Sequence, residues 1–276
     1  MNMNYGFCDL CISPRNFEEQ TLSRMLTELY QLGYETVAIN QTLDESVFND
    51  GKRKKGQNTT NRFVVPEPVD IKNLVEEFKG KLTILNRITF IFSDPLRTHS
   101  LAQSSALKKY HLYAALPKSQ DAFQFACSQL NADIIVINTP RSGLSINRKM
   151  YFRAIQRGLH FEIQYTHLIN PDTRKVALYY SHLFHSVGKS KNVIITSGAH
   201  NKMQLRNPYD IINLAALLGL SETKAKASLH WQCRFLLLKA EGRRFGKAIF
   251  SIVPLKKRSL DNTEETTSPV TKKKKL

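Results

Sequence analysis

Short apolar runs alternate along the chain with segments of helical periodicity. Seven of these runs are rich in Ile, Val and Phe and are often apolar at consecutive positions, as in DIIVIN and NVIIT. Such runs are typical of strands that are covered on both faces, and hence of a parallel sheet. We therefore predict strands at Tyr5–Leu10, Thr36–Asn40, Leu82–Ser93, His111–Leu116, Asp133–Asn138, His160–Tyr165 and Asn192–Thr196.

Amphipathic helices are predicted between these strands. In the first, apolar residues recur between Leu22 and Leu29 with the i, i+3, i+4, i+7 spacing of a helix that buries one face. Asn16 and Glu19 have the spacing of a capping box at its start, and Gly33 stands at its end. Further helices are predicted at Ser100–Lys108, Gln120–Leu130, Arg148–Arg157 and Asp172–Val187.

The stretch from Ile194 to Ser221 combines a strand, a polar turn and a helix. Asn207 is a suitable N-cap for this helix, and Pro208 fits its first position. Gly219 ends the helix, and Ser221 caps another that we predict to run through ETKAKASLHWQCRFLLLKA. Because its polar residues follow a strand, this stretch is either an active site or a docking surface.

The number of strand–helix units predicts the fold class. Seven or more such units in 276 residues favour an α/β, TIM-barrel-like single domain over residues 1–253. A long polar, basic loop from Gln41 to Asn73 interrupts the pattern. After Val253 the apolar periodicity ends, and residues 254–276 have the composition of a disordered tail.

The net charge of +17 indicates a polyanionic partner. Residues 51–62 carry five basic residues and no acid, and residues 254–276 carry seven basic and three acidic residues, which leaves +8 on the rest. A membrane partner is not expected, because the sequence lacks an apolar run of about 18 residues and a basic amphipathic helix with bulky apolar anchors. Nucleic acid is the favoured partner.

Cysteine usage favours the reducing interior of the cell. Four cysteines, Cys8, Cys11, Cys127 and Cys233, are too few for a disulfide framework in a chain of this length. Cys8 and Cys11 have CxxC spacing, but they fall in a predicted strand, where residues three apart point to opposite faces. We interpret this pair as packing cysteines.

A metal-dependent hydrolase is the enzymatic alternative. Such a barrel collects His, Asp and Glu ligands at the carboxyl ends of several strands. Asp9, Glu162 and His200 could serve, but the first strand lacks the His-x-His pair that opens many such sites. The sequence also lacks a G-x-S-x-G elbow, and GKRKKG lacks the Walker spacing. We therefore expect no catalytic residue, no metal, no cofactor and no small-molecule substrate.

RNA binding has more support, because basic residues follow or flank the rigid elements. Phosphate contacts require Lys and Arg on such elements together with backbone N–H groups at helix starts. Between Lys202 and Lys247, Asp and Glu number only three. No signature of a module that reads single strands is present, so binding of a folded RNA by shape and phosphate fits better. The candidate RNA-binding residues are Arg87, Lys202, Arg206, Lys224, Lys226, Arg234, Arg243, Arg244 and Lys247.

Three segments carry a resemblance to a known family: LGYETVAIN, LNRITFIFSDP and the stretch from Lys191 to Arg234. Most specific is the series of Ser-x-Ala, Arg-x-Pro-x-Asp-Ile-x-Asn-Leu, Gly-Leu and Ala-Lys-Ala within the last segment. In this order, from about Tyr5 to Val253, the chain resembles the TIM-barrel-like 30-kDa protein subunit of eukaryotic ribonuclease P, which has archaeal relatives.

The resemblance implies a non-catalytic subunit of a ribonucleoprotein whose RNA removes 5′ leaders from precursor tRNA. It also implies that the subunit is shared with RNase MRP, which acts on precursor ribosomal RNA. The implied partners are the ribonuclease P RNA, precursor tRNA and other protein subunits of the two enzymes. The implied fold is related to PHP phosphoesterases, so a PHP-like phosphoesterase remains the alternative. By the resemblance, Arg87 and Arg206 are the family-type basic positions, and Ile194–Ser221 is a docking surface.

The basic tail predicts a localisation. Its two clusters have the composition of a nuclear localisation signal or an RNA-binding arm, with a solubilising tail as the alternative. In a nuclear ribonucleoprotein the first interpretation is favoured, and a nuclear, nucleolar location is expected. The residues concerned are Lys256, Lys257, Arg258, Lys272, Lys273, Lys274 and Lys275.

Overall fold

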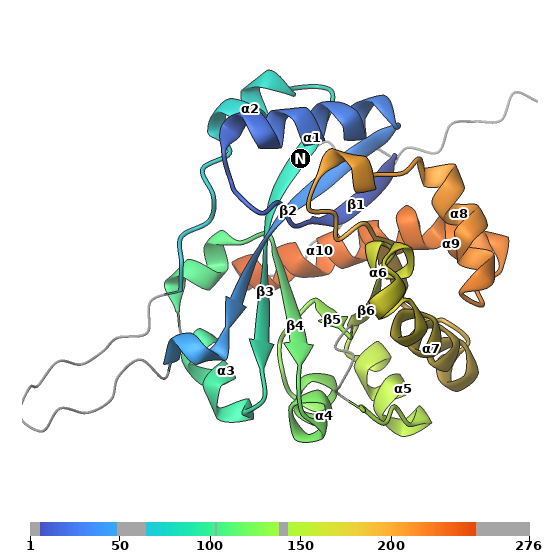
Figure 1. Cartoon of the computed structure of the whole chain (residues 1–276). Helices are drawn as coiled ribbons and strands as arrows, with labels where there is room; N and C mark the ends of the chain where they lie inside the picture. The colour runs from blue at the N-terminus through green and yellow to red at the C-terminus, as the bar shows by residue number, and fades with distance from the viewer. Residues whose placement is uncertain (1–5, 49–64, 103, 138–142, 247–276) are drawn as a thin grey trace, which may run out of the picture.

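Seven parallel strands form one sheet in the order of the sequence, β1 to β7 (Figure 1). The computed structural model describes residues 6–48, 65–102, 104–137 and 143–246. All seven predicted strands are confirmed, with ends that shift by a few residues. Their bounds are β1 Phe7–Ile12, β2 Tyr34–Asp44, β3 Thr83–Phe92, β4 Leu112–Pro117, β5 Ile134–Val136, β6 His160–Gln164 and β7 Val193–Thr196.

The sheet curls into a nearly closed barrel, as predicted. Its first and last strands meet at their carboxyl ends, where Ile12 and Ala199 form a parallel bridge. The Ser13 amide donates to the Ala199 carbonyl at 2.8 Å, and the Gly198 amide donates to the Cys11 carbonyl at 2.8 Å. These backbone bonds join the two edges of the sheet there.

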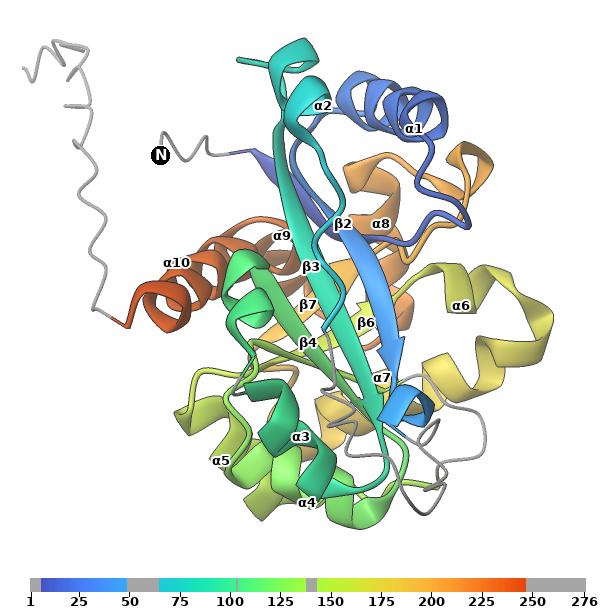
Figure 2. The same ribbon diagram turned by 90° about the vertical axis from the view of Figure 1, so that its left-hand side faces the viewer.

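Helices surround the barrel. In both views α1 and α2 lie together at one end of the molecule, and α3, α4 and α5 lie at the other (Figure 1, Figure 2). The α-helices are α1 Glu19–Gln31, α2 Lys72–Glu77, α3 Pro95–Ala102, α4 Gln120–Ser128, α5 Arg148–Gln156, α6 Thr166–Ile169, α7 Pro171–Gly188, α8 Pro208–Leu217, α9 Glu222–Leu229 and α10 Trp231–Phe245. Three 3-10 segments are η1 Glu45–Phe48, η2 Ser105–Lys109 and η3 Lys202–Gln204.

The starts of α8 and α1 differ in whether the capping pattern in the sequence predicts them. The side chain of Asn207 accepts a hydrogen bond from the Tyr209 amide at 2.9 Å, so the predicted N-cap of α8 is confirmed. The predicted capping box of α1 is wrong, because Glu18 is the N-cap residue and makes no side-chain cap bond. Entry into α8 is therefore fixed locally, whereas α1 is held by its buried apolar face.

Three other predicted boundaries are corrected. The helix predicted at Ser100–Lys108 is replaced by α3 and η2. The long helix predicted after Ser221 breaks at His230, where φ is −131° and ψ is −86°, into α9 and α10. The loop predicted from Gln41 begins later, because β2 continues to Asp44. Its middle part, residues 49–64, and the tail, residues 247–276, lie outside the described residues.

Helix α10 covers the amino-terminal end of the barrel. Its Cys233, Leu236 and Ala240 are buried among the inward-facing apolar residues of the strands. Its polar residues bond to the segments that enter those strands: Lys239 Nζ donates to the Ala132 carbonyl at 3.1 Å. The four cysteines of the chain are buried and free, as expected of packing residues.

Candidate functional site

An ion pair crosses the interior of the barrel. Arg87 lies on β3 with 0% of its side chain exposed, and its guanidinium donates to both carboxylate oxygens of Glu162 on β6. The distance from Nη2 to Oε2 is 2.7 Å. Nη1 also donates to the Leu10 carbonyl on β1 at 2.8 Å. Bidentate geometry of this kind is the strongest form of carboxylate–guanidinium pairing.

Neighbouring strands satisfy the remaining groups around this pair. Thr196 Oγ1 donates to Glu162 Oε1 at 2.9 Å, and Gln164 Nε2 donates to Oε2 at 3.0 Å. On the other side, Thr89 Oγ1 accepts from Arg87 Nε at 3.4 Å and donates to an Asn40 oxygen at 2.6 Å. The Glu162 carboxylate is therefore engaged on both oxygens by groups of the protein itself.

Asp9 lies at the seam between β1 and β7. Its Oδ1 accepts from the Ser197 amide at 3.0 Å and from the Cys11 amide at 3.3 Å. Its Oδ2 has no hydrogen-bond partner among the residues that the structure describes. Burial raises the pKa of this carboxyl from 3.8 to about 6, although the Ser197 and Cys11 hydrogen bonds oppose the shift.

We expect Asp9→Asn to stabilise the protein at neutral pH. Because the folded state holds the Asp9 proton more tightly than the unfolded chain, the contribution of Asp9 to stability falls as pH rises from about 4 to about 6 and then stays constant. The variant should gain about 3 kcal/mol above pH 6, given about 1.4 kcal/mol for each of the roughly two pKa units of the shift. Urea unfolding of both proteins across this pH range measures the effect.

The difference in free energy of unfolding between the variant and the unchanged protein, taken at each pH, isolates the contribution of Asp9. Burial lowers the pKa of both His111 and His160 to about 4. The stability that these two histidines contribute to the folded protein therefore also decreases as pH falls through the same range. They are present in both proteins and cancel in the difference. A difference that does not change between pH 4 and pH 6 would contradict the burial effect.

The three residues of the metal-dependent alternative do not form a ligand set. His200 is exposed, and its Nδ1 lies 2.6 Å from the Ser13 carbonyl. Glu162 is held by Arg87, and Asp9 bonds to the backbone at the seam. Within residues 6–246 as far as they are described, no group of three or more His, Cys, Asp or Glu could hold a metal ion.

The prediction that Arg87 contacts RNA is wrong. A side chain with 0% exposure, paired inside the barrel, cannot reach a phosphate outside it. The sequence contained a signal for this: Arg87 stands within an apolar strand run, and a charge buried in such a run needs a partner of opposite charge. Glu162, in a second apolar run, is that partner, and its pairing with Arg87 was missed.

Other predicted RNA-binding residues lie on the surface near α8, α9 and α10. Lys202, Arg206 and Lys226 are exposed. Arg206 Nη1 donates to the carbonyls of Met203 and Leu205 at 2.8 and 2.7 Å, which fixes part of its guanidinium. Half-buried Lys224 donates from Nζ to a carbonyl of the loop before β7 at 2.6 Å. These positions allow phosphate contacts.

The predicted RNA-binding residues Arg243 and Arg244, at the end of α10, make contacts within the protein. Arg243 pairs with Asp133, with 2.9 Å between Nη2 and Oδ2 and exposed side-chain fractions of 7% and 0%. Its predicted RNA contact is corrected to an anchor that holds α10 to the start of β5. Half-buried Arg244 donates to the Lys108 carbonyl at 3.1 Å. Lys247 and the basic residues of the tail lie outside the described residues.

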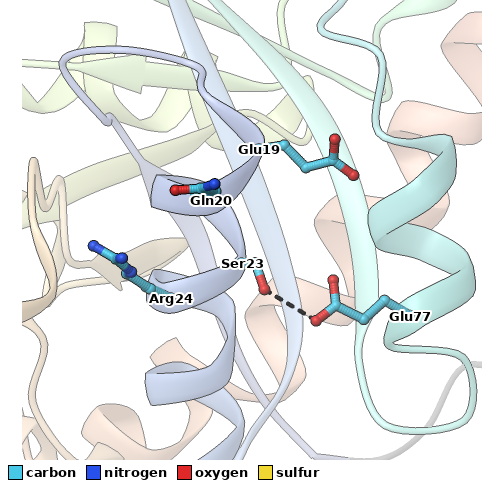
Figure 3. A pocket seen from close by; sticks show the side chains of 5 residues that line it. All are labelled: Glu19, Gln20, Ser23, Arg24 and Glu77. Atoms are coloured by element: carbon cyan, nitrogen blue, oxygen red, sulfur yellow. Dashed lines mark hydrogen bonds between the residues drawn. The ribbon is translucent and has the colours of Figure 1, made fainter.

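A surface depression between α1 and α2 is not a catalytic site (Figure 3). Ser23 on α1 and Glu77 on α2 point toward each other in it, and Ser23 Oγ donates to Glu77 Oε1 at 3.0 Å. Two carboxylates in a set of five side chains repel phosphate, and the lining residues are exposed or half-buried. The lining residues are Glu19, Gln20, Ser23, Arg24 and Glu77.

Among the helices in the described part of the chain, none combines the length and apolar character that a bilayer span requires.

Comparison with known proteins gives one consistent result. The family described as RNase P subunit p30 matches residues 6–245. Ribonuclease P protein subunit p30 of Mus musculus is 34% identical over 273 residues, covering 98% of each chain. Ribonuclease P/MRP protein subunit RPP1 of Saccharomyces cerevisiae is 25% identical over 213 residues, covering 75% of this chain and 68% of the yeast protein.

A solved structure shares the fold. A chain from a cryo-EM structure of archaeal ribonuclease P with mature tRNA aligns with a TM-score of 0.62 at 15% identity. The alignment covers 91% of this chain and 100% of the archaeal one. The barrel and its surrounding helices therefore form a known arrangement.

Proposed function

Because the chain belongs to the RNase P subunit p30 family, we propose that it binds the RNA of a ribonuclease P ribonucleoprotein and supports the removal of 5′ leaders from precursor tRNA. The family match over residues 6–245 is the observation that carries this proposal, and it agrees with the resemblance found in the sequence. In this proposal the RNA subunit performs the cleavage, and the protein contributes no catalytic group.

The barrel interior supports a non-catalytic role. In barrel enzymes, polar groups at the carboxyl ends of the strands converge on a substrate or a metal. Here Arg87 and Glu162 neutralise each other, and Thr196 and Gln164 complete the carboxylate's hydrogen bonds. The interior is therefore a structural polar core.

The proposal includes further assemblies. The yeast relative is named a subunit of both ribonuclease P and RNase MRP, which supports a shared role for this chain as well. Relatives named as protein subunits also support the presence of other protein subunits as partners. A nuclear, nucleolar location follows from such a role, and deletion of residues 254–276 should move a fluorescent fusion out of the nucleus, as seen by microscopy.

The RNA contact is assigned to the exposed cations near α8 and α9. We expect the combined variant Lys202→Ala, Arg206→Ala, Lys226→Ala to bind ribonuclease P RNA about 100-fold more weakly at about 0.15 M salt, since each lost contact removes about one released counterion. The slope of log affinity against log salt should become shallower by about 2. Fluorescence anisotropy at several salt concentrations measures both.

A matched control removes three exposed cations from another face. Arg24, Lys72 and Lys79 lie on or beside α1 and α2, near the carboxylates of the depression described above. Replacing all three with Ala changes the net charge equally and should leave the slope nearly unchanged. If the slope of log affinity against log salt becomes shallower by the same amount in both triple variants, the RNA contact is not localised to α8 and α9, and the assignment fails.

A further inference from the structure

Five aromatic side chains form a continuous row at the amino-terminal end of the barrel. Ring centroids are 5.4 Å apart for Phe7 and Tyr209, 6.4 Å for Phe7 and His230, 5.8 Å for His230 and Trp231, and 6.0 Å for Trp231 and Phe235. The rings come from β1, α8, the α9–α10 junction and α10. Figure 1 shows these three helices, in orange to red, beside one another on one side of the barrel. We call these five residues the aromatic row.

The outer part of the row contributes little to the folded core. Tyr209, Trp231 and Phe235 are 62%, 49% and 59% exposed. Helix α10 buries the opposite face, through Cys233 and Leu236, which are 0% exposed. Large aromatic side chains that stay accessible and contiguous mark interaction surfaces.

Cations accompany the rings. The Arg234 guanidinium lies 5.3 Å from the Trp231 ring centroid. Exposed Arg206 precedes Tyr209 by three residues, and exposed Lys226 lies one helical turn before His230. From residue 206 to residue 235 the chain has four basic and two acidic residues. Proteins that bind single-stranded nucleic acid combine aromatic rings, on which the bases stack, with cations that contact the phosphates.

We propose that the aromatic row stacks on unpaired nucleobases of the bound RNA, while Arg206, Lys226 and Arg234 contact the adjoining phosphates. The proposal rests on the proposed function, which supplies the RNA. It goes beyond that function because phosphate contacts alone would accept paired and unpaired segments equally. The row therefore selects an accessible, unpaired segment such as a loop, bulge or strand end.

Trp231 makes the test direct, because it is the single tryptophan of the chain. The full chain is titrated with an oligoadenylate of about 12 nucleotides and, separately, with a duplex of the same length. We expect the single strand to quench Trp231 fluorescence strongly and the duplex to quench it weakly. Phe235→Leu and Tyr209→Leu should each weaken single-strand binding about tenfold. The control, Tyr179→Leu on α7, alters a residue that is also 59% exposed and should change nothing.

Each other outcome decides against stacking. The oligoadenylate could bind in a salt-dependent way without quenching Trp231, and the Phe235→Leu and Tyr209→Leu variants could bind it as well as the unchanged protein does. That result overturns the inference and leaves the proposed function standing. Equal quenching by the duplex also overturns it. If neither this oligonucleotide nor ribonuclease P RNA binds, the proposed function fails as well. If a purified protein subunit of ribonuclease P quenches Trp231 and RNA does not, the row is a protein-docking surface.

Discussion

Glu162→Gln is expected to lower the free energy of unfolding by about 3–5 kcal/mol, the range for removing one partner of a buried ion pair. Glutamine has nearly the same shape, so packing is kept, but the Arg87 guanidinium remains fully buried without a counter-charge. The cost is the desolvation of that cation, which the carboxylate offsets in the native protein. Urea denaturation followed by circular dichroism measures the change.

Two further variants separate charge burial from other causes. Glu67→Gln removes the exposed pair that Glu67 forms with Lys109 at 2.7 Å, and it should cost less than about 1 kcal/mol. The double variant Arg87→Met, Glu162→Leu removes both buried charges and should recover most of the stability lost by Glu162→Gln. A loss below about 1 kcal/mol for Glu162→Gln would show that the buried ion pair contributes no more to stability than an exposed one.

Arg243→Met is expected to lower the free energy of unfolding by about 3 kcal/mol and to leave the salt dependence of RNA binding unchanged. Methionine keeps the apolar stem of the side chain, but it leaves the Asp133 carboxylate buried without its cation. The Tyr113 amide still donates to this carboxylate at 2.9 Å, which limits the loss. Urea denaturation and RNA-binding titrations on the same preparation measure the two effects.

Arg206→Met is the matched comparison. Its side chain is exposed, and it should show the reverse pattern, with little loss of stability and a shallower salt slope. An Arg243→Met protein of normal stability with a reduced slope would return Arg243 to the RNA-contacting set and remove its role as the anchor of α10.

Much of the fold was predictable because its signals are local. Runs such as DIIVIN hold apolar side chains for both faces of one strand, so the strands and their parallel arrangement follow from the sequence. Asn207 and Pro208 define the start of α8 from two adjacent positions, and the structure keeps this cap.

The misplaced residues depend on distant contacts. Because both faces of β3 are covered, the pattern of its residues does not show that Arg87 points into the barrel, and its partner lies 75 positions away. Likewise, the apolar pattern continues through His230, but the chain breaks there so that α10 can cross the barrel end. Arg243 belongs to this second case, because its role depends on where that helix lies against Asp133.

The covering of the barrel by α10 has a consequence for how the protein is made. The strands come first in the chain, whereas the helix that seals their amino-terminal end is the last element described. A nascent chain still held by the ribosome would therefore expose an unsealed apolar interior until Trp231–Phe245 has emerged. Such exposed surface favours association with other chains, so the chain is most prone to aggregate during the part of its synthesis that precedes α10.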